Sequence, residues 1–434
     1  MSRLGSVLLA AQLRWRFDRW SAERLLAHQR DRVRRLVAYV AEHAPYYRER
    51  IEPGTPLDQV PKMDKATMMA HFDAINTAGL RRDDLVAFRT RQEHERTAGF
   101  YPGGYSVGLS SGTSGNKVLT VLSPHERDRY AALLWARSGI PRGLRPKRVL
   151  FALRAHNEAF TTVTRFGVTL VYVDYLQTPE TLLRLVNEHR LNVLAGPPSI
   201  LALLAERRRE IVGPVDALVS YAEELDAGTR ARLEAAFGTR VAEIYQGAEG
   251  MIGTTCSAGA LHLNEDVVLV EVDDVGDAIG DAGAVVVTDL YRTTQPFLRY
   301  RLGDLLEIGG RDCACGSSFR VIRRIHGRAD GTFLLPDGRG GTVPLMPDYV
   351  RRSINRASQD VDEYQAIQHA PGDVEIRLVL APGADRAAIE GAVRANLAMW
   401  CERAGGVPPA VRFSEAPPER NPRSGKLIRV RRTF

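Results

Sequence analysis

Ser110-Ser111-Gly112-Thr113-Ser114-Gly115-Asn116-Lys117 is the most informative stretch of this chain. Its hydroxyl side chains and the backbone N–H groups of a two-glycine turn can surround an anion, because glycine permits close backbone approach. Lys117 places a positive charge beside that anion. The stretch differs from the common nucleotide loop G-x-x-x-x-G-K-[ST], since Asn116 separates glycine from lysine. It predicts a phosphate-binding loop, with a polar surface turn as the alternative.

Lysine is rare in this chain. Of its 59 lysines and arginines, five are lysines: Lys62, Lys65, Lys117, Lys147 and Lys426. All the other residues in this count are arginines. A position that keeps the compact ammonium group of lysine is therefore a candidate for a functional position. Lys117 closes the loop described above, and Lys426 lies near the end of the chain. These two lysines are the first catalytic candidates.

Composition limits the classes of protein to which the chain can belong. Its 434 residues are 44% hydrophobic, enough for a sizeable core and more than one domain. The net charge of +7 comes from arginines spread along the chain, which favours small anionic substrates over nucleic acid. No apolar run reaches the roughly 18 residues of a membrane span, so we expect no membrane partner. Four cysteines are too few for a disulfide framework, and we expect a cytoplasmic protein.

The middle of the chain alternates between strand and helix patterns. Five apolar runs predict buried strands: 148–153, 167–175, 192–196, 216–220 and 240–245. Helix-start signals follow two of them, at Thr178-Pro179 and at Pro197-Pro198-Ser199. Such alternation predicts a parallel sheet flanked by helices. Ligands bind these sheets beyond the carboxyl ends of the strands, where Tyr221–Glu223 and Tyr245–Glu249 fall.

The two ends of the chain have other patterns. Residues 7–50 carry apolar side chains at helical spacing, and prolines are expected to break that helix near its end. Residues 260–310 are rich in strand patterns. The predicted fold class is α/β. A large N-terminal domain, residues 1–326, would contain parallel β-sheets flanked by helices and a β-rich subdomain, and a small α+β domain would comprise residues 327–434.

Four further segments follow the loop in a fixed order: Tyr245-Gln246-Gly247-Ala248-Glu249, Arg299-Tyr300-Arg301-Leu302-Gly303-Asp304, Gly327-Arg328-Ala329-Asp330 and Pro422–Lys426. Each one alone is weak, since a carboxylate after a strand is more often a helix cap or a solvated charge. Together and in this order they resemble the adenylate-forming superfamily of acyl-CoA synthetases and adenylation domains. The chain length and the run Leu261-His262-Leu263-Asn264-Glu265-Asp266 are most similar to the phenylacetate–CoA ligase and coenzyme F390 synthetase branch.

The resemblance implies how this chain would bind ATP. The β- and γ-phosphates would be held by the loop residues Ser110, Ser111, Gly112, Thr113, Ser114, Gly115 and Lys117. Tyr221, Ala222 and Glu223 would form the adenine wall, and Tyr245 would stack on the base. Asp304 would accept hydrogen bonds from the ribose hydroxyls. The other two implied contacts are Arg328 with ribose and phosphate, and Glu249 with Mg²⁺.

The resemblance also implies a two-step reaction. The carboxylate of a small acid attacks the α-phosphate of ATP, pyrophosphate leaves, and Lys426 bridges the two reacting groups. Lys426, Glu249 and Arg328 are therefore the implied catalytic residues. The small, mobile C-terminal domain then rotates about Asp330, and the acyl group passes to CoA as cosubstrate.

The acid pocket is less well defined by sequence. Its candidates near the strand ends are His156, Asn157, Tyr221, Gln246 and Gly247. A histidine at this place is as often a core or helix-start residue. The branch resemblance alone predicts an aromatic or other small carboxylic acid. Gln246 and Ala248 stand where the superfamily usually has glycine and threonine, so a hydroxyl near the metal is missing.

Other functions stay open on these residues. The acceptor can be an amine, nitrite or a similar group in place of CoA, or the reaction can stop at adenylation. A non-catalytic nucleotide-binding relative is the alternative from another class. Retention of Lys426 in a lysine-poor chain favours the enzyme. A homodimer is also left open.

Cys256, His262, Cys313 and Cys315 are candidate metal ligands. Three thiolates and one imidazole suit tetrahedral Zn²⁺, although the long separation between the two pairs is no standard finger spacing. Some members of the resembled branch carry a comparable cluster. The alternative is three small core cysteines and a hydrogen-bonded histidine. We expect a structural role for Zn²⁺ here, and ordinary packing for Cys401.

Overall fold

The computed structural model describes residues 2–95, 97, 99–109, 118–141, 145–153, 162–164, 166–174, 177–274, 282–420 and 427–434. The chain divides into two compact units. Unit 1 comprises Met1–Glu271, Val287–Arg301 and Gly309–Ile322, and unit 2 comprises Val272–Val286, Leu302–Ile308 and Arg323–Phe434. The chain therefore passes between the units several times before it stays in unit 2. No helix among these described residues is long and apolar enough to cross a membrane.

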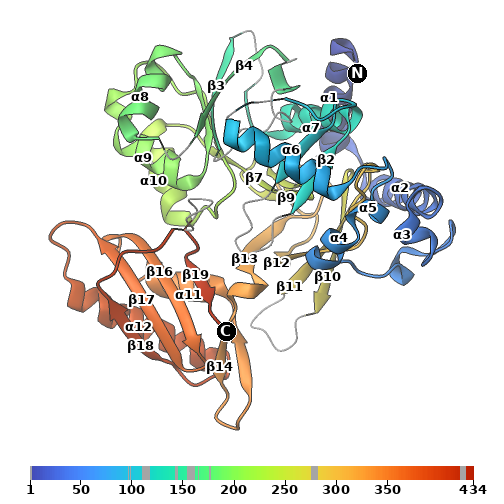
Figure 1. Cartoon of the computed structure of the whole chain (residues 1–434). Helices are drawn as coiled ribbons and strands as arrows, with labels where there is room; N and C mark the ends of the chain where they lie inside the picture. The colour runs from blue at the N-terminus through green and yellow to red at the C-terminus, as the bar shows by residue number, and fades with distance from the viewer. Residues whose placement is uncertain are drawn as a thin grey trace. The chain divides into compact units, whose positions relative to one another are not determined.

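A seven-stranded sheet forms the centre of unit 1, in the order β4-β3-β5-β6-β7-β8-β9 (Figure 1). Its strands are β3 (Lys147–Leu153), β4 (Val168–Asp174), β5 (Val193–Gly196), β6 (Ala217–Ser220), β7 (Val241–Gly247), β8 (Gly250–Thr255) and β9 (Leu261–Leu263). The first five strands in that order are parallel, and β8 and β9 continue the sheet antiparallel. The predicted parallel sheet is confirmed, because buried apolar runs alternate with capped helices as expected.

Helices pack on this sheet. Figure 1 shows three of them together on one side: α8 (Pro179–Glu188), α9 (Pro198–Glu206) and α10 (Ala227–Phe237). Their apolar side chains form one core with the strands, in which Leu150, Leu182, Leu194, Leu201 and Leu218 are fully buried. Thr178 caps α8 as predicted, and Asp226 caps α10. A short 3-10 turn, Arg208–Glu210, follows α9.

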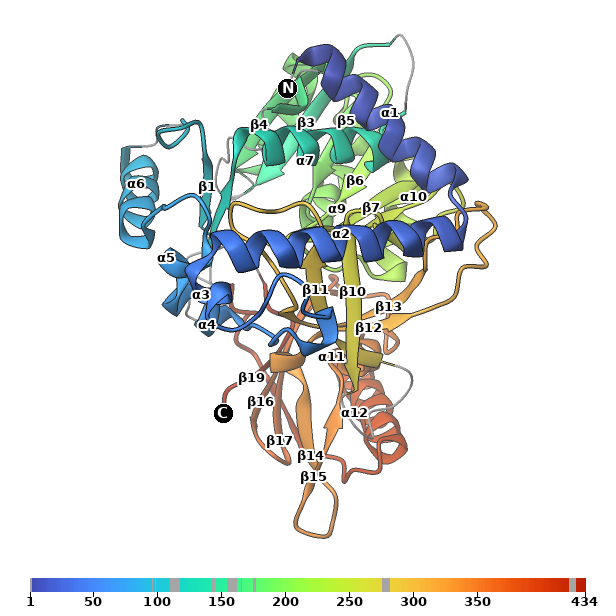
Figure 2. The same ribbon diagram turned by 90° about the vertical axis from the view of Figure 1, so that its right-hand side faces the viewer.

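The N-terminal segment differs from the single helix predicted for residues 7–50. It forms α1 (Arg3–Arg19), α2 (Ala22–His43) and α3 (Pro45–Arg48), shown in Figure 2. The chain breaks at Ser21 because its hydroxyl accepts a hydrogen bond from the Arg24 N–H and starts a new helix. The remaining elements before the sheet are η1 (Leu57–Gln59), α4 (Lys65–Ala70), α5 (Phe72–Ile75), α6 (Arg82–Glu95), β1 (Ser106–Leu109), β2 (Leu119–Leu122) and α7 (Pro124–Arg137).

The C-terminal half contains three further sheets. A four-stranded sheet contains β10 (Val268–Asp274), β11 (Ala282–Asp289), β12 (Tyr300–Ile308) and β13 (Ile322–Arg328). Unit 2 also contains η4 (Ala329–Gly331), the hairpin β14 (Phe333–Pro336) and β15 (Thr342–Leu345), α11 (Pro347–Asn355), β16 (Val361–Ala370), β17 (Asp373–Leu380), α12 (Arg386–Arg403), β18 (Ala410–Ser414) and β19 (Val430–Arg432). The last four strands pair in the order β18-β17-β16-β19. Cys401 is fully buried in this core, as ordinary packing requires.

Candidate functional site

Several predicted site residues lie outside the described residues. They are the loop Ser110–Lys117, the pocket candidates His156 and Asn157, and the segment Pro422–Lys426. Their roles stay predictions. The described candidates fall in both units: Tyr221–Glu223 and Tyr245–Glu249 in unit 1, and Asp304, Arg328 and Asp330 in unit 2.

The turn between β7 and β8 carries Glu249 at the carboxyl end of a parallel strand. Gly247 pairs with Gly250, so Ala248 and Glu249 alone connect the two strands. Gly250 has φ +142°, a conformation that side chains rarely adopt. Glu249 is buried at this turn, and its charge interacts with that of Arg292. The turn is therefore short, and Glu249 is placed by backbone geometry.

Arg292 joins this turn to β2, the strand that follows the predicted phosphate loop. Its guanidinium donates to the carbonyl of Ala248 at 2.6 Å and to the carbonyl of Val121 at 3.1 Å. Gln295 holds the same strand, because its amide oxygen accepts from the Val121 N–H at 2.8 Å and its amide nitrogen donates to the Leu119 carbonyl at 2.9 Å. Sequence reasoning missed both residues, since a buried arginine and a glutamine three residues apart match no motif.

Tyr221 braces the ends of the parallel strands. Its buried hydroxyl lies 2.9 Å from the carbonyl oxygen of Ala152 and 3.0 Å from that of Ala195. Burial raises the pKa of this phenol well above its usual value. The next residue, Ala222, has φ +68°, and the Glu223 carboxylate accepts from the Ser199 N–H at 3.3 Å, at the start of α9. The turn is thus held from both sides, and its contact with adenine or the acid stays a prediction.

Unit 2 brings Asp304, Arg328 and Asp330 together. The Arg328 guanidinium lies 3.7 Å from a carboxylate oxygen of Asp304 and donates to Asp330 at 3.2 Å. Gly303, at φ +82°, leaves room for it, because a Cβ there would lie 3.0 Å from a nitrogen of Arg328. The roles that the resemblance implies for these three residues stay predictions.

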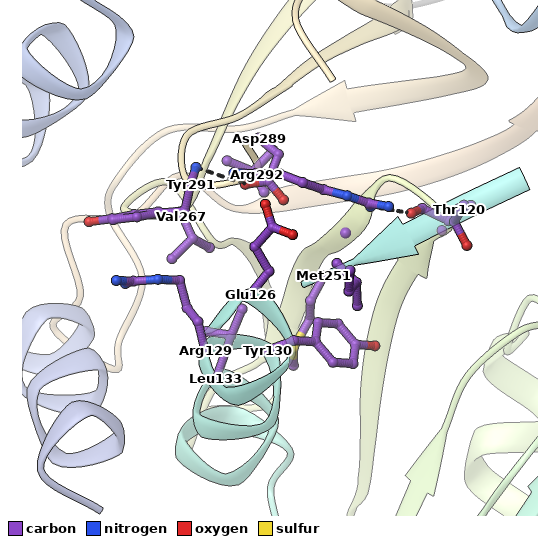
Figure 3. A pocket seen from close by; sticks show the side chains of 15 residues that line it. Thr120, Glu126, Arg129, Tyr130, Leu133, Met251, Val267, Asp289, Tyr291 and Arg292 are labelled. Carbon is purple, nitrogen blue, oxygen red and sulfur yellow. Dashed lines mark hydrogen bonds between the residues drawn. The ribbon is translucent and has the colours of Figure 1, made fainter. Parts of the chain in front are cut away.

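A pocket in unit 1 adjoins the β7–β8 turn (Figure 3). Its lining comes from segments far apart in sequence: Thr120 and Leu122; Glu126, Arg129, Tyr130 and Leu133; Gly247, Ala248, Gly250 and Met251; Val267 and Val268; Asp289, Tyr291 and Arg292. Of the predicted acid-pocket residues, Gly247 lines it directly. Gln246 is bound beside it, since its amide oxygen accepts from the Tyr130 hydroxyl at 2.5 Å.

Glu126 fixes the α7 wall of this pocket. Ser123 and Glu126 form a reciprocal capping box at the start of α7. The same carboxylate accepts from the backbone N–H groups of Thr293 and Thr294 at 2.7 and 2.8 Å. The Ser-x-x-Glu spacing was the sequence signal for the cap, whereas the contacts across 167 residues had none.

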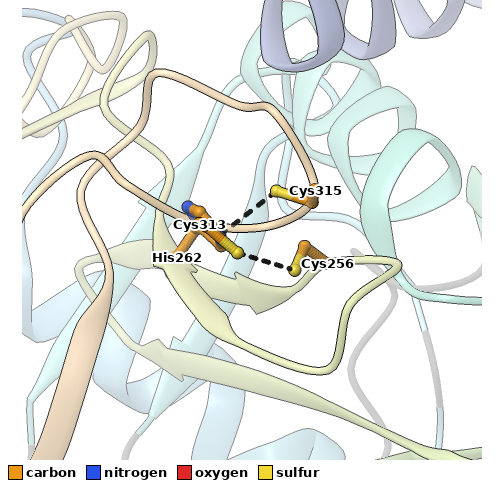
Figure 4. A group of neighbouring side chains, drawn as sticks. All are labelled: Cys256, His262, Cys313 and Cys315. Carbon is orange, nitrogen blue, oxygen red and sulfur yellow. Dashed lines mark hydrogen bonds between the residues drawn. The ribbon is translucent and has the colours of Figure 1, made fainter.

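Cys256, His262, Cys313 and Cys315 converge at one point of unit 1 (Figure 4). Their four ligand atoms lie within 4.8 Å of one another. The sulfurs of Cys256 and Cys313 are 3.8 Å apart, and the Cys315 sulfur is 3.5 Å from Nε2 of His262. A tetrahedron with Zn–S bonds of about 2.3 Å has sulfur–sulfur edges of about 3.8 Å, so these four residues fit a tetrahedral Zn²⁺.

The surroundings orient this cluster for a metal. Nδ1 of His262 lies 2.8 Å from the Phe319 carbonyl oxygen, which leaves Nε2 facing the thiols. Burial and the neighbouring Cys313 and Cys256 raise the pKa of the Cys315 thiol to about 12. A divalent cation bound among these sulfurs would lower that pKa and hold them as thiolates.

Comparison with known proteins agrees with this geometry. No family model matches the chain. Phenylacetate–coenzyme A ligase of Thermus thermophilus is 26% identical over 388 residues, which cover 81% of this chain and 80% of that protein. The crystal structure of 2-hydroxyisobutyryl-CoA ligase in the postadenylation state has a TM-score of 0.72 at 21% identity and covers 96% of this chain and 91% of that one. ATP-bound MatB from Rhodopseudomonas palustris has a TM-score of 0.54 at 18% identity, with 96% of both chains covered.

These likenesses show that the chain has the fold of adenylate-forming ligases, and the sequence likeness supports an AMP-forming ligase. Its sequence is similar to that of phenylacetate–CoA ligase.

Proposed function

We propose that this ligase adenylates a small carboxylic acid with ATP, releases pyrophosphate, and transfers the acyl group to CoA. The observation that carries the proposal is the sequence likeness to phenylacetate–coenzyme A ligase along 81% of the chain. The short turn that positions Glu249 and its Arg292 link to β2 support a nucleotide site at the end of the parallel sheet. An aromatic acid is the first substrate class to test.

The described residues support distinct parts of the first step. Asp304 would accept the ribose hydroxyls, and Arg328, held beside it, would reach the ribose and phosphates. Glu249 would hold Mg²⁺, whose chemistry is to neutralise charge on the phosphates. Ala248 adds no hydroxyl ligand there, so water would complete the metal shell.

Pyrophosphate release over a panel of acids, with and without CoA, tests the reaction. We expect release with at least one aromatic or short-chain acid, and thioester only when CoA is present. Release followed by capture on an amine or nitrite would identify another acceptor. ATP binding without turnover of any acid would instead support a non-catalytic nucleotide-binding protein.

The proposed role of Lys426 gives a sharper test. Lys426→Ala should lower the rate of acyl-AMP formation by at least about 100-fold, because a positive charge at the reacting oxygens is lost. Thioester formation from supplied acyl-AMP should change little. Lys65→Ala, in α4, is the matched control and should leave both half-reactions intact. Equal loss of both half-reactions in Lys426→Ala would contradict the role.

We also propose that residues 327–434 rotate about Asp330 between the two half-reactions. Asp330 lies in the 3-10 turn η4, at the start of that segment. Asp330→Pro restricts the backbone there and should slow thioester formation more than adenylation. An equal effect on both steps would argue against a hinge at this residue.

We propose that the Cys256–His262–Cys313–Cys315 cluster binds structural Zn²⁺. Bound there, the ion would cross-link two segments of unit 1 and take no part in the reaction. Metal analysis of the purified protein should find about one zinc per chain. Protein without zinc that is as stable as protein supplied with it would refute the site.

A further inference from the structure

The pocket in Figure 3 contains a carboxylate without a cationic partner. One oxygen of Asp289 accepts from the backbone N–H groups of Tyr291 and Arg292, at 2.9 and 3.1 Å. Among the described residues, the other oxygen has no hydrogen-bond donor and Asp289 forms no ion pair. The charge of Arg292 lowers the pKa of Asp289, but the two side chains form no ion pair, since that guanidinium donates to the Ala248 and Val121 carbonyls. A partly buried charge is costly unless something pairs with it.

The same pocket contains a guanidinium without an anionic partner. Arg129 has no hydrogen bond or ion pair with any residue that the structure describes. Its guanidinium carbon lies 3.9 Å from the centroid of the Tyr291 ring, and that of Arg32 lies 4.1 Å from the same centroid. Arg16 adds a third guanidinium, which donates to the Tyr291 hydroxyl at 3.2 Å.

The charges are thus separated across one cavity. Glu126 lies near Asp289 and adds negative charge at that end, while Arg16 and Arg32 add positive charge at the end of Arg129. Between them the wall is apolar, with Leu122, Leu133, Met251, Val267 and Val268. The spacing of Glu126, Arg129, Tyr130 and Leu133 puts all four on one face of α7, so a single helix supplies both signs of charge.

We infer that this pocket binds a small zwitterionic amino acid with an apolar side chain. Its ammonium group would pair with Asp289, its carboxylate with Arg129, and its side chain would pack on the apolar wall. A ligand of one charge would leave the other protein charge unpaired, and this mismatch provides the selectivity. The inference goes beyond the proposed reaction and does not depend on it, because binding is measured without ATP or CoA.

Three probes with the same isobutyl group test the charge requirement. L-Leucine carries both charges, 4-methylpentanoate lacks the amine, and 3-methylbutylamine lacks the carboxylate. We expect calorimetry on the full chain to detect L-leucine, and each single-charge analogue to bind at least about tenfold more weakly. Equal binding of 4-methylpentanoate would overturn the inference in favour of a simple anion site. Absence of binding by L-leucine, L-valine, L-methionine and L-phenylalanine at about 10 mM would also overturn it.

Two variants test the assigned partners. Asp289→Asn keeps the oxygen that accepts the two backbone N–H groups but removes the charge, and Arg129→Gln removes the guanidinium from a half-buried position. Each should weaken L-leucine at least about tenfold. The exposed Asp83→Asn and Arg30→Gln are matched controls and should bind as the unmodified chain does. If Asp289→Asn does not fold, Arg129→Gln decides alone: unchanged L-leucine affinity there would overturn the inference.

Discussion

The cysteine–histidine cluster and the pocket at Asp289 are two buried polar groups of unit 1 with opposite arrangements. In the cluster, four ligand atoms from two segments gather within 4.8 Å of one another. In the pocket, a carboxylate and a guanidinium line one cavity but do not pair with each other. The cluster is arranged for a ligand that holds the chain together, whereas the pocket is arranged for one that can come and go. The difference predicts opposite effects of removing a polar group at the two sites.

The largest effect is expected at the cluster. Cys313→Ser removes one ligand of the proposed Zn²⁺ and should lower the free energy of unfolding by more than about 4 kcal/mol, because metal binding is coupled to folding. Urea denaturation and zinc content measure it. Cys401→Ser, a fully buried thiol in unit 2, is the matched control and should leave the zinc content unchanged. Equal zinc content in Cys313→Ser and Cys401→Ser would show that Cys313 is not a zinc ligand and would contradict the contrast between cluster and pocket.

The opposite sign is expected at the pocket. The pKa of Asp289 is raised to about 6, mainly by burial and also by the charge of Glu126, although Arg292 and the two backbone N–H groups lower it. The ionised carboxylate therefore destabilises the fold above that pH. Asp289→Asn should raise the free energy of unfolding by about 3 kcal/mol at pH 8, from a shift of about two pKa units.

The pH dependence checks the sign. As pH falls through about 6, the folded protein takes up the proton on Asp289 before the unfolded chain does. The unmodified protein thereby gains stability, and the advantage of Asp289→Asn should shrink toward zero near pH 4. Denaturation curves at pH 8, 6 and 5 measure it, with Asp83→Asn as the control. A variant advantage that is constant with pH would contradict an ionised Asp289.

A smaller effect is expected for Glu126, which serves the fold and the pocket together. Glu126→Gln should cost about 1–2 kcal/mol, since charge-assisted hydrogen bonds to Thr293 and Thr294 weaken. It should also lower the pKa of Asp289, because a neighbouring negative charge is gone. The pH at which stability changes would then move downward. If the pH profile of stability does not move in Glu126→Gln, the charge of Glu126 does not act on Asp289.

The smallest effect is expected for Arg129. Arg129→Gln should change the free energy of unfolding by less than about 1 kcal/mol, because the stacking on Tyr291 is the main contact it loses. Thermal denaturation without ligand measures it. A loss as large as that of Cys313→Ser would make Arg129 a part of the fold rather than of a binding pocket.

Sequence reasoning predicted the parts of the fold that local pattern determines. Buried apolar runs and helix caps such as Thr178 were sufficient to predict the five parallel strands and α8. The break at Ser21 was missed, because apolar spacing continues through α1 and α2 and hides a cap that only the hydroxyl geometry reveals. Unit 2 was predicted less completely, because its strands pair with distant partners, as β16 does with β19.

The candidate site also has residues that the sequence could predict and residues that it could not. Residue chemistry predicted that His262 and the three cysteines would gather, whereas the roles of Asp304 and Arg328 stay predictions. The place of Asp289 and Arg292 in the pocket could not be predicted, since the spacing Asp-x-x-Arg is not a signal for a cavity. Their environment arises from contacts with α7 and β2, which lie more than 150 residues earlier in the chain.

The cluster also has a consequence for chain entropy. Cys256 and Cys313 are separated by 57 residues, and that segment contains every passage of the chain from unit 1 into β10, β11 and β12 and back to Gly309. A metal that joins its ends closes a loop in the unfolded chain as a disulfide would. Such a closure is worth about 4 kcal/mol for a loop of this length. One ion would thus limit the freedom of three strands, β10, β11 and β12, that contribute no ligand to it.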